Sequence, residues 1–386
     1  MPAAVAVDAP TPILAPAILG LLGGGQLGRF FVQAAHDLGY RVWVLDPDPS
    51  SPAGRIADRH LAADYADRVA LDALALGCAA VTTEFENVPA ASLEYLARAL
   101  RVRPSAAAVA VCQDRIAEKT FLRDQQLPHG PFAVMRSERD LTTAPATLFP
   151  GVLKVARFGY DGKGQARVVT RDEALAAWHS LGGEACVLES LLPLDCEVSV
   201  VLARDATGSA ACFPVAENSH RRGILDVSIV PARISPALAE AARQCALQIA
   251  AALGYVGTLG VEFFISGGAL YVNEMAPRPH NSGHYTLDAC ATSQYEQQVR
   301  ALCGLPLGGT ALVSPAVMVN LLGDLWSAGE PQWARLLSLP NLRLHLYGKH
   351  EARPGRKMGH FTVLGPDQAQ VVATALNARA AIGIRD

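Results

Sequence analysis

Two glutamates, Glu262 and Glu274, lie in strand-like segments that are joined by a Ser-Gly-Gly turn. Such segments, rich in Val, Phe, Ile and Tyr, are typical of a β-hairpin. If the turn centres on Gly268, the two carboxylates face each other with Cβ atoms roughly 4.5–5.5 Å apart, and they repel unless a cation separates them. With the amide oxygen of Asn273 they form an all-oxygen set that suits Mg²⁺ bound together with substrate phosphates. The alternative is two solvated carboxylates on a surface hairpin.

Composition excludes several classes of protein. The chain has 386 residues, 51% hydrophobic and 18% charged, which indicates two or three domains with large cores. A net charge of −3 gives no support for binding to nucleic acid or to an anionic membrane. The sequence contains no uninterrupted apolar run of about 18 residues, so no transmembrane helix is predicted. Residues 1–16 lack a basic region and are broken by prolines, so we expect a disordered extension rather than a signal peptide.

The eight cysteines form no CxxC pair and lie mostly in apolar surroundings. This favours small buried side chains in a reducing, cytoplasmic environment over a disulfide framework or a zinc site.

The chain divides into units with different patterns. Residues 17–115 alternate strand and helix patterns, which predicts a parallel sheet covered by helices, an α/β unit. Residues 116–312 hold several strand patterns and are typical of an α+β domain with antiparallel pairing. Residues 313–386 are expected to form a small third unit.

The run from Gly23 to Gly28 satisfies G-x-G-x-x-G between a strand and a helix, and Asp46 ends the next strand. This is the fingerprint of a dinucleotide site and its acidic partner, although any phosphate can use amides at a helix N-terminus. A turn needed only for packing is equally compatible with these residues. Glu84 follows the third strand and could accept from ribose hydroxyls or an amine, or belong to a polar loop capped by Asn87.

Lys154 lies inside an apolar strand and needs an anionic partner, because an unpaired buried charge is costly. The glycine-rich segment that follows, Phe158 to Gln165, could approach a polyphosphate through its backbone or form a simple hairpin turn.

The loop after Glu274 is dense in polar side chains. His280 and His284 have the i, i+4 spacing of a helical zinc site, but prolines and Gly283 argue against a regular helix there. Hydrogen-bond donors beside a metal suit an anionic, polyhydroxylated substrate. A basic cluster near the C-terminus is either a solvated turn or a phosphate pocket, and its members are Lys349, Arg353, Arg356, Lys357 and His360.

Together these motifs resemble the ATP-grasp superfamily and, within it, the N5-carboxyaminoimidazole ribonucleotide synthetases of purine biosynthesis. The resemblance covers nearly the whole chain after residue 16. The segments that carry it are, in order, GGGQLGR, EFENVP, QDRIAEK, GYDGKGQ, NEMAPRPHNSGH and GRKMGH. It implies ATP-grasp architecture: an N-terminal pre-ATP-grasp domain, a central two-part ATP-grasp domain with a flap, and a small C-terminal domain.

The resemblance implies ligation of bicarbonate to the amine of 5-aminoimidazole ribonucleotide, with ATP cleaved to ADP and phosphate and Mg²⁺ as cofactor. A cytoplasmic homodimer is expected. Glu262 and Glu274 match the metal ligands, and Asp161, Lys349 and Arg278 are the expected catalytic residues. The positions matching ATP contacts are Arg115, Lys154, Phe158, Gly159, Tyr160, Asp161, Gly162, Lys163, Gly164, Glu189, Ser190, Leu191, Leu192, Glu197, His220, Asn273 and Glu274. The positions matching contacts to the ribonucleotide are Gln26, Glu84, Arg278, His280, Asn281, Ser282, Lys349, Arg356 and Lys357.

Other functions remain open at this level. A related enzyme could use formate or bicarbonate on another purine intermediate. An NAD-dependent oxidoreductase would rest on the glycine turn and Asp46, but would leave Lys154 and the carboxylate pair unexplained. A non-catalytic nucleotide-binding module is disfavoured by the intact Lys154, Glu262 and Glu274.

Overall fold

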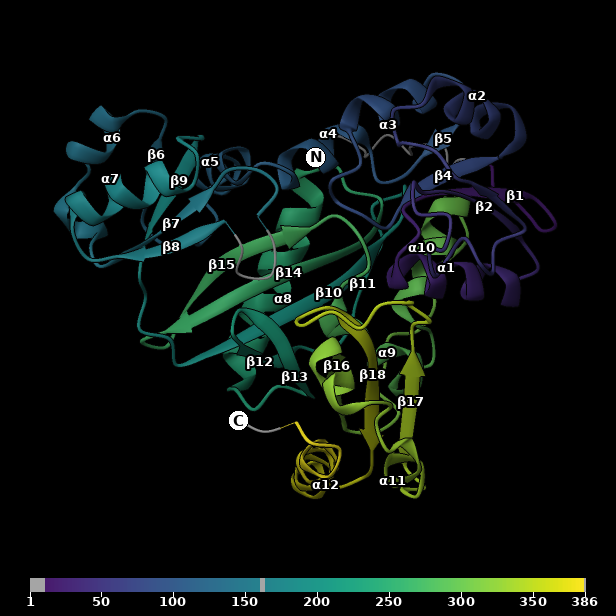
Figure 1. Cartoon of the computed structure of the whole chain (residues 1–386). Helices are drawn as coiled ribbons and strands as arrows, with labels where there is room; N and C mark the ends of the chain where they lie inside the picture. The colour runs from purple at the N-terminus through teal and green to yellow at the C-terminus, as the bar shows by residue number, and fades with distance from the viewer. Residues whose placement is uncertain (1–10, 160–163, 385–386) are drawn as a thin grey trace, which may run out of the picture.

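The computed structural model describes residues 11–159 and 164–384 (Figure 1). Tyr160, Asp161, Gly162 and Lys163, all expected to belong to the flap, lie outside the described residues, as do residues 1–10. None of the helices in the described part of the chain is long and apolar enough to cross a lipid bilayer.

The N-terminal unit is the expected parallel sheet, with strand order β3-β2-β1-β4-β5. Its central strands are apolar and fully buried at positions such as Leu19, Leu21 and Val44, because helices cover both faces. The strands are β1 (Ile18–Leu22), β2 (Arg41–Leu45), β3 (Arg59–Leu61), β4 (Ala80–Thr83) and β5 (Arg101–Val102). The helices are α1 (Gln26–Asp37), α2 (Arg68–Gly77), α3 (Ala90–Ala97) and α4 (Ala106–Cys112).

The segment before this sheet is not a free extension where the structure describes it. The amide of Ile13 donates to the carbonyl of Cys303 at 2.8 Å, and the Tyr40 hydroxyl donates to the carbonyl of Ile13 at 2.7 Å. Arg101 donates to the carbonyl of Thr11 at 2.9 Å. The expected disorder of residues 1–16 is therefore wrong for residues 11–16, because backbone groups of Thr11 and Ile13 bind Tyr40 and Arg101 of the N-terminal unit and the carbonyl of Cys303.

The central unit begins with a small antiparallel sheet of order β6-β9-β7-β8, which forms its own lobe in Figure 1. Helix α5 starts at an Asp114 cap whose carboxylate accepts from the amides of Ile116 and Ala117. The lobe contains α5 (Arg115–Asp124), β6 (Phe132–Met135), α6 (Glu138–Thr142), η1 (Ala146–Leu148), β7 (Gly151–Val155), β8 (Gln165–Val168), α7 (Arg171–Ser180) and β9 (Cys186–Ser190).

The remaining strands form one large antiparallel sheet. Their order in it is β15-β14-β10-β12-β13-β16-β18-β17, with β11 paired to β10. Because β13 pairs with β16, this sheet runs without a break from the central unit into residues 313–386. Its strands are β10 (Cys196–Arg204), β11 (Ala210–Cys212), β12 (Ala216–Arg221), β13 (Ile224–Val230), β14 (Gly257–Ser266), β15 (Ala269–Ala276), β16 (Ala316–Leu322), β17 (Leu342–Leu346) and β18 (Lys357–Leu364).

Helices join the units as well as covering the large sheet. Helix α8 packs on β10, β14 and β15, whereas α10 packs its Val299 and Leu302 into the core of the N-terminal unit. The remaining helices are α8 (Pro236–Ala252), η2 (Asn281–Gly283), α9 (Thr286–Ala289), α10 (Gln294–Cys303), η3 (Gly323–Ala328), α11 (Trp333–Leu337) and α12 (Gln368–Ala381).

Candidate active site

A cleft of about 1140 Å³ lies where the N-terminal unit, the small lobe and the large sheet meet. It brings together nearly all of the described residues that the sequence pointed to. From the ATP set it is lined by Arg115, Lys154, Phe158, Gly159, Glu189, Ser190, Leu191, Leu192, Glu197, His220, Asn273 and Glu274. From the ribonucleotide set it is lined by Gln26, Glu84, Arg278, His280, Asn281, Lys349, Arg356 and Lys357, and Glu262 also lines it.

Two described candidates do not line this cleft. Gly164 lies just before β8, close to the side chain of Val155. Ser282 is fully buried beneath His280. An expected direct contact between Ser282 and a ligand is therefore not supported, because other side chains cover its hydroxyl.

The carboxylate pair exists, but a β-bulge produces it. Ser266 pairs with Ala269, so the turn holds two glycines and centres between Gly267 and Gly268. An unbroken ladder would then place Glu262 opposite Asn273. The register shifts next to Glu262, so that Asn273 is an extra residue and Glu262 pairs with Glu274. Bulges of this kind re-aim side chains next to functional sites.

The electrostatics of this pair fit a cation. Burial and the nearby carboxylate of Glu274 raise the pKa of Glu262 to about 7. Burial also acts to raise the pKa of Glu274, but the charges of Arg115 and Lys154 outweigh it and lower that pKa. The Glu262 carboxylate lies 3.4 Å from Nε2 of His280 and 3.4 Å from Nδ2 of Asn273. A hard cation would relieve the repulsion, and carboxylate oxygens are the ligands that Mg²⁺ prefers.

Lys154 has the anionic partner that its position requires. Its Nζ lies 3.0 Å from Oε1 of Glu189, while Nζ of Lys119 lies 3.1 Å from Oε2 of the same carboxylate. Burial opposes ionisation of Glu189, but the two lysines lower its pKa to about 2. Arg115 lies 3.6 Å from Glu274. The cations therefore gather on one wall of the cleft, where phosphates would bind.

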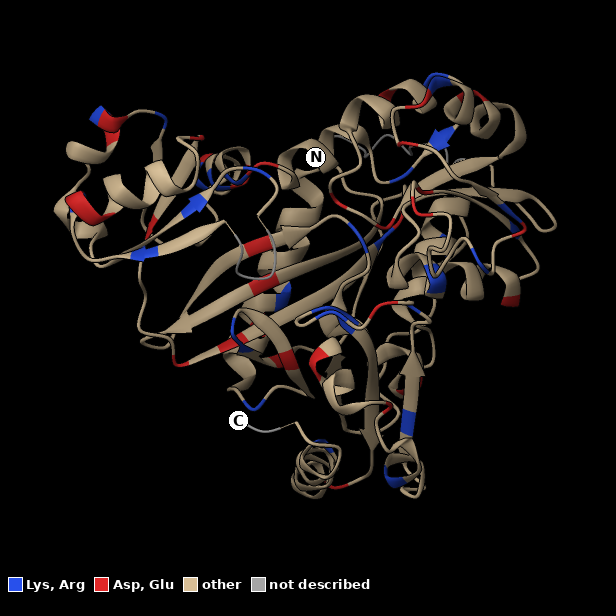
Figure 2. Cartoon of the chain, viewed as in Figure 1, with Lys and Arg blue, Asp and Glu red and all other residues tan. Residues whose placement is uncertain are grey.

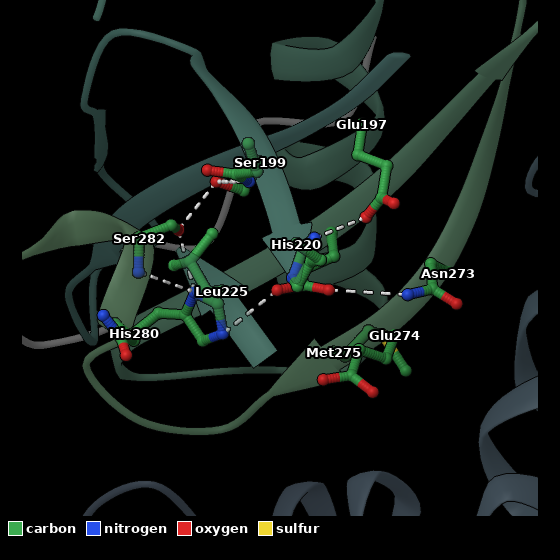
Figure 3. A network of polar contacts seen from close by, with 12 residues as sticks. Glu197, Ser199, His220, Leu225, Asn273, Glu274, Met275, His280 and Ser282 are labelled. Atoms are coloured by element: carbon green, nitrogen blue, oxygen red, sulfur yellow. Dashed lines mark hydrogen bonds and ion pairs between the residues drawn. The ribbon is translucent and has the colours of Figure 1, made fainter. Parts of the chain in front are cut away.

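Two backbone amides of the connector after Glu189 are already bonded to the protein's own carbonyls. The amide of Ser190 donates to the carbonyl of Pro131 at 3.0 Å, and that of Leu191 donates to Pro150 at 2.9 Å. Within residues 11–159 and 164–384, no acceptor contacts the amide of Leu192. Figure 3 shows Glu197 on β10 next to His220 on β12. Oε2 of Glu197 lies 2.8 Å from Nδ1 of His220.

The glycine turn is filled by the chain's own carboxylates. The amide of Gly24 donates to Asp46 at 2.6 Å, and the amides of Gly25 and Gly28 donate to the two oxygens of Glu84 at 2.7 and 2.9 Å. Asp46 also accepts from Tyr65 at 2.7 Å. A dinucleotide pyrophosphate would have to displace buried carboxylates from this helix N-terminus, which argues against the oxidoreductase alternative.

A second wall of the cleft, formed by the loop before β18, is basic, and Arg278 after β15 also lines the cleft. Arg278 forms a short ion pair with Glu86, and the charge of Glu86 raises the pKa of Arg278 against the effect of burial. Lys349 donates to the carbonyl of Lys357 at 2.7 Å, and Arg356 donates to that of Glu351 at 2.9 Å. In Figure 2 the loop that leads into β18 is blue, and red positions lie on β14 and β15, at the other end of the large sheet.

His284 and His360 point away from this site. They stack at 4.6 Å in a buried cluster, and their Nδ1 atoms face the hydroxyls of Tyr295 and Tyr347 at 2.7 and 2.9 Å. His280 and His284 thus belong to separate environments, although they are four residues apart. The expected inclusion of His360 in the phosphate-binding cluster is wrong, because its ring is fully buried.

Sequence reasoning missed several residues of the site. Lys119 is four residues after Arg115 on α5, a spacing that puts both cations on one helix face. Glu118 accepts from the amide of Met275 at 2.5 Å, and burial raises its pKa to about 7. Glu86 is two residues after Glu84 and reaches Arg278 instead of the glycine turn. Their motifs were recognised, but nothing local indicated that Glu86 and Glu118 line the cleft while Lys119 supports it from a buried position.

Family models match the three parts of this architecture. A ribonucleotide synthetase preATP-grasp domain matches residues 17–113, and an ATP-grasp domain matches residues 120–295. A phosphoribosylaminoimidazole carboxylase C-terminal domain matches residues 316–374.

Individual proteins are similar over almost their full length. The chain is 46% identical to an N5-carboxyaminoimidazole ribonucleotide synthase of Brucella melitensis, over 90% of this chain and 96% of that protein. An N5-carboxyaminoimidazole synthetase structure from Staphylococcus aureus complexed with ADP superposes with a TM-score of 0.89, 37% identity and 95% and 98% coverage. An Aspergillus clavatus synthase structure with ADP and 5-aminoimidazole ribonucleotide has a TM-score of 0.85, 30% identity and 95% and 98% coverage. The chain therefore belongs to the N5-carboxyaminoimidazole ribonucleotide synthase family.

Proposed function

We propose that the chain is an ATP-dependent carbon–nitrogen ligase that carboxylates 5-aminoimidazole ribonucleotide with bicarbonate in purine biosynthesis. The products are N5-carboxyaminoimidazole ribonucleotide, ADP and phosphate. The observation that carries the proposal is one cleft with two charged walls: Lys154 and Arg115 beside the carboxylate pair, and Lys349 with Arg356 in the loop before β18, at the other end of the large sheet. Arg278, just after β15, lines the same cleft. The site thus offers places for a triphosphate and for a second phosphorylated substrate.

Each wall would serve one substrate. Glu262 and Glu274 would hold Mg²⁺, which would neutralise the charge of the phosphates. Lys154 and Arg115 would hold the phosphates of ATP, with the apolar segment after Glu189 beside the adenine. Arg356, Lys357 and Lys349 would hold the 5′-phosphate of the ribonucleotide.

The reaction then follows from positioning and charge neutralisation, which supply most of the acceleration in phosphoryl transfer. A bicarbonate oxygen attacks the γ-phosphorus of ATP, the bond to the β-phosphate oxygen breaks, and carboxyphosphate and ADP form. The substrate amine attacks the carboxyl carbon, phosphate leaves, and the amine loses a proton. Arg278 and Lys349 lie where they can hold the anionic groups of this second step.

The direct test is ADP release with ATP, bicarbonate and 5-aminoimidazole ribonucleotide, omitting each in turn. We expect full turnover only with all three and Mg²⁺. Activity with formate, or with another purine intermediate as the amine, would instead favour a different ligase of the superfamily. Homodimer formation and a cytoplasmic location remain predictions from the resemblance, and light scattering after size-exclusion chromatography would test the first.

A further inference from the structure

A network of buried polar side chains ends on His280. Figure 3 shows its part from Ser199 through Ser282 to His280. Ser199, Asn218 and Ser228 come from β10, β12 and β13, which are neighbours in the large sheet, and Ser282 comes from η2. Their exposed fractions are 1%, 7%, 0% and 0%. None of these four lines the cleft among the residues that the structure describes.

The donors and acceptors of this network all run in one direction, from Ser228 toward His280. The backbone amide of Ser282 lies 3.3 Å from Nδ1 of His280, and an amide can only donate, so Nδ1 carries a lone pair. The Ser282 hydroxyl donates to the same nitrogen at 2.8 Å and accepts from Ser199 at 2.7 Å. Ser199 accepts from Nδ2 of Asn218 at 2.9 Å, and Oδ1 of Asn218 accepts from Ser228 at 2.8 Å.

The far side of the imidazole faces a proposed metal ligand. Because Nδ1 accepts, a neutral ring carries its hydrogen on Nε2. Nε2 lies 3.4 Å from Oε1 of Glu262, and Nδ2 of Asn273 lies 3.4 Å from Oε2. The protonated Nε2 and the Asn273 amide therefore face the two oxygens of the Glu262 carboxylate, the amide as a hydrogen-bond donor, and Glu274 faces it from the neighbouring strand.

We propose that Ser282, Ser199 and Asn218 are positioning residues that fix the Nε2–H tautomer of His280, so that this ring orients Glu262 for the cation. The inference deepens the proposed function and rests on it for the identity of the cation. Its chemical basis is general: hydrogen bonds around a ligand set its orientation, and removing them typically costs about 10- to 100-fold in metal affinity or activity.

The sharpest variant is Asn218→Asp, which keeps the shape of the side chain but replaces its donor by an acceptor. Ser199 must then donate to the new carboxylate instead of to Ser282, so the Ser282 hydroxyl can turn to Ser199 and leave Nδ1. Ser199→Ala removes the same link without adding charge. Ser92→Ala is the matched control, because Ser92 is also a buried serine but lies in α3, outside the site.

The primary measurement is the ¹⁵N spectrum of histidine-labelled protein without metal or nucleotide, with the His280 signals assigned by their loss in His280→Gln. We expect an unprotonated Nδ1 and protonated Nε2 in the wild type and in Ser92→Ala. In Asn218→Asp and Ser199→Ala we expect a partial rise in Nδ1 protonation, because the Ser282 hydroxyl at 2.8 Å is freed to turn while the longer amide contact at 3.3 Å remains. In turnover assays, the same two variants should need about 10-fold more Mg²⁺ for half-maximal rate while kcat at saturating Mg²⁺ stays close to wild type.

Two results would overturn the inference: an Nδ1–H tautomer in the wild type, or an unchanged tautomer in both Asn218→Asp and Ser199→Ala. Since the spectrum needs no turnover, it decides the tautomer even if the proposed reaction fails. If Asn218→Asp does not fold, Ser199→Ala alone carries the test, because it deletes a single buried hydroxyl. An unchanged Mg²⁺ dependence with an altered tautomer would show that His280 does not orient a metal ligand.

Discussion

Lys154 and Lys119 hold one carboxylate from two sides, but their surroundings give them different roles. Both lie about 3 Å from oxygens of Glu189, at 3.0 and 3.1 Å. The Lys154 side chain is 12% exposed and lines the cleft, whereas that of Lys119 is 1% exposed and also donates to the carbonyl of Asn273 at 2.9 Å. Lys154 can therefore turn toward a phosphate while Lys119 keeps Glu189 paired.

Lys154→Met should impair ATP use and leave the fold intact. A charge-assisted hydrogen bond is worth roughly 1.5–3 kcal/mol, so the KM for ATP should rise about 10- to 100-fold, with lower turnover. Circular dichroism and the thermal midpoint should stay close to wild type, because Lys119 still pairs with Glu189. An unfolded variant would instead make Lys154 a member of a structural ion pair.

Lys119→Met is the control for that experiment. Removing one partner of a fully buried pair typically costs about 3–5 kcal/mol, so its free energy of unfolding in urea should fall by about that amount. Equal stability losses in the two lysine variants would contradict the division of roles.

At the scale of elements, the pattern of the sequence predicted which strands and helices form better than how they pair. The alternation expected over residues 17–115 forms the parallel sheet with its helices, and the hairpin expected around Gly268 is formed by β14 and β15. The pairing of Glu262 with Glu274 was predicted from a turn centred on Gly268, whereas the turn is centred between Gly267 and Gly268. The predicted pairing is correct only because of the bulge at Asn273. No local signal marks such a bulge, since it depends on where the neighbouring strand and Lys119 hold the backbone. Strand β12 carries little apolar signal, because its Asn218 belongs to the buried polar network and its His220 lines the cleft.

Glu262→Gln and Glu274→Gln should each lower kcat steeply and raise the Mg²⁺ requirement. Each removes one negative oxygen donor from the hairpin, and a loss of about 4 kcal/mol corresponds to roughly 10³-fold in rate. Glu217→Gln is a suitable control. Glu217 lies on β12, pairs with Arg233 and does not line the cleft. Near-normal activity of either hairpin variant at limiting Mg²⁺ would show that the metal assignment is wrong.

At the scale of the whole molecule, the units meet at a stack of histidines. The rings of His284, His360 and His345 stack with centroids 4.6 and 4.7 Å apart, and Phe30 of α1 packs against all of them. His345 also pairs with Asp288 at 2.9 Å. Burial lowers the pKa of His284 and His360 well below the usual 6.5, and neighbouring histidines add to the effect. Both rings are therefore neutral in the folded protein at neutral pH.

This stack should make stability depend on pH in one direction. Because the folded pKa values are depressed, the unfolded chain binds more protons below pH 6.5, and folding stability falls as the pH drops from 6.5 toward the native pKa values. Each ring should contribute about 1.4 kcal/mol per pH unit in that window. His360→Phe should retain the aromatic packing and show a shallower loss of thermal stability between pH 6.5 and 5. An identical slope in wild type and variant would contradict the assignment.

The cleft also depends on the whole molecule, because its basic wall comes from residues that the chain places far from the carboxylate pair. Local sequence could indicate the charges of Lys349 and Arg356, but only the continuous large sheet brings them into the same cleft as β14 and β15. This arrangement predicts separate effects on the two substrates. Arg356→Ala should raise the KM for 5-aminoimidazole ribonucleotide about 10- to 100-fold, since a charge-assisted hydrogen bond is worth roughly 1.5–3 kcal/mol.

The KM for ATP should barely change in Arg356→Ala, because the ATP phosphates are assigned to the wall that carries Lys154 and Arg115. The variant should also discriminate less than wild type between the ribonucleotide and its dephosphorylated nucleoside, as expected if the lost contact is to the 5′-phosphate. Arg335→Ala is the matched control, since Arg335 lies on α11 in the same unit, donates to the carbonyl of Ala381 and does not line the cleft. Equal increases in both KM values would mean that Arg356 serves ATP or only holds the loop before β18 in place, through its contact with Glu351.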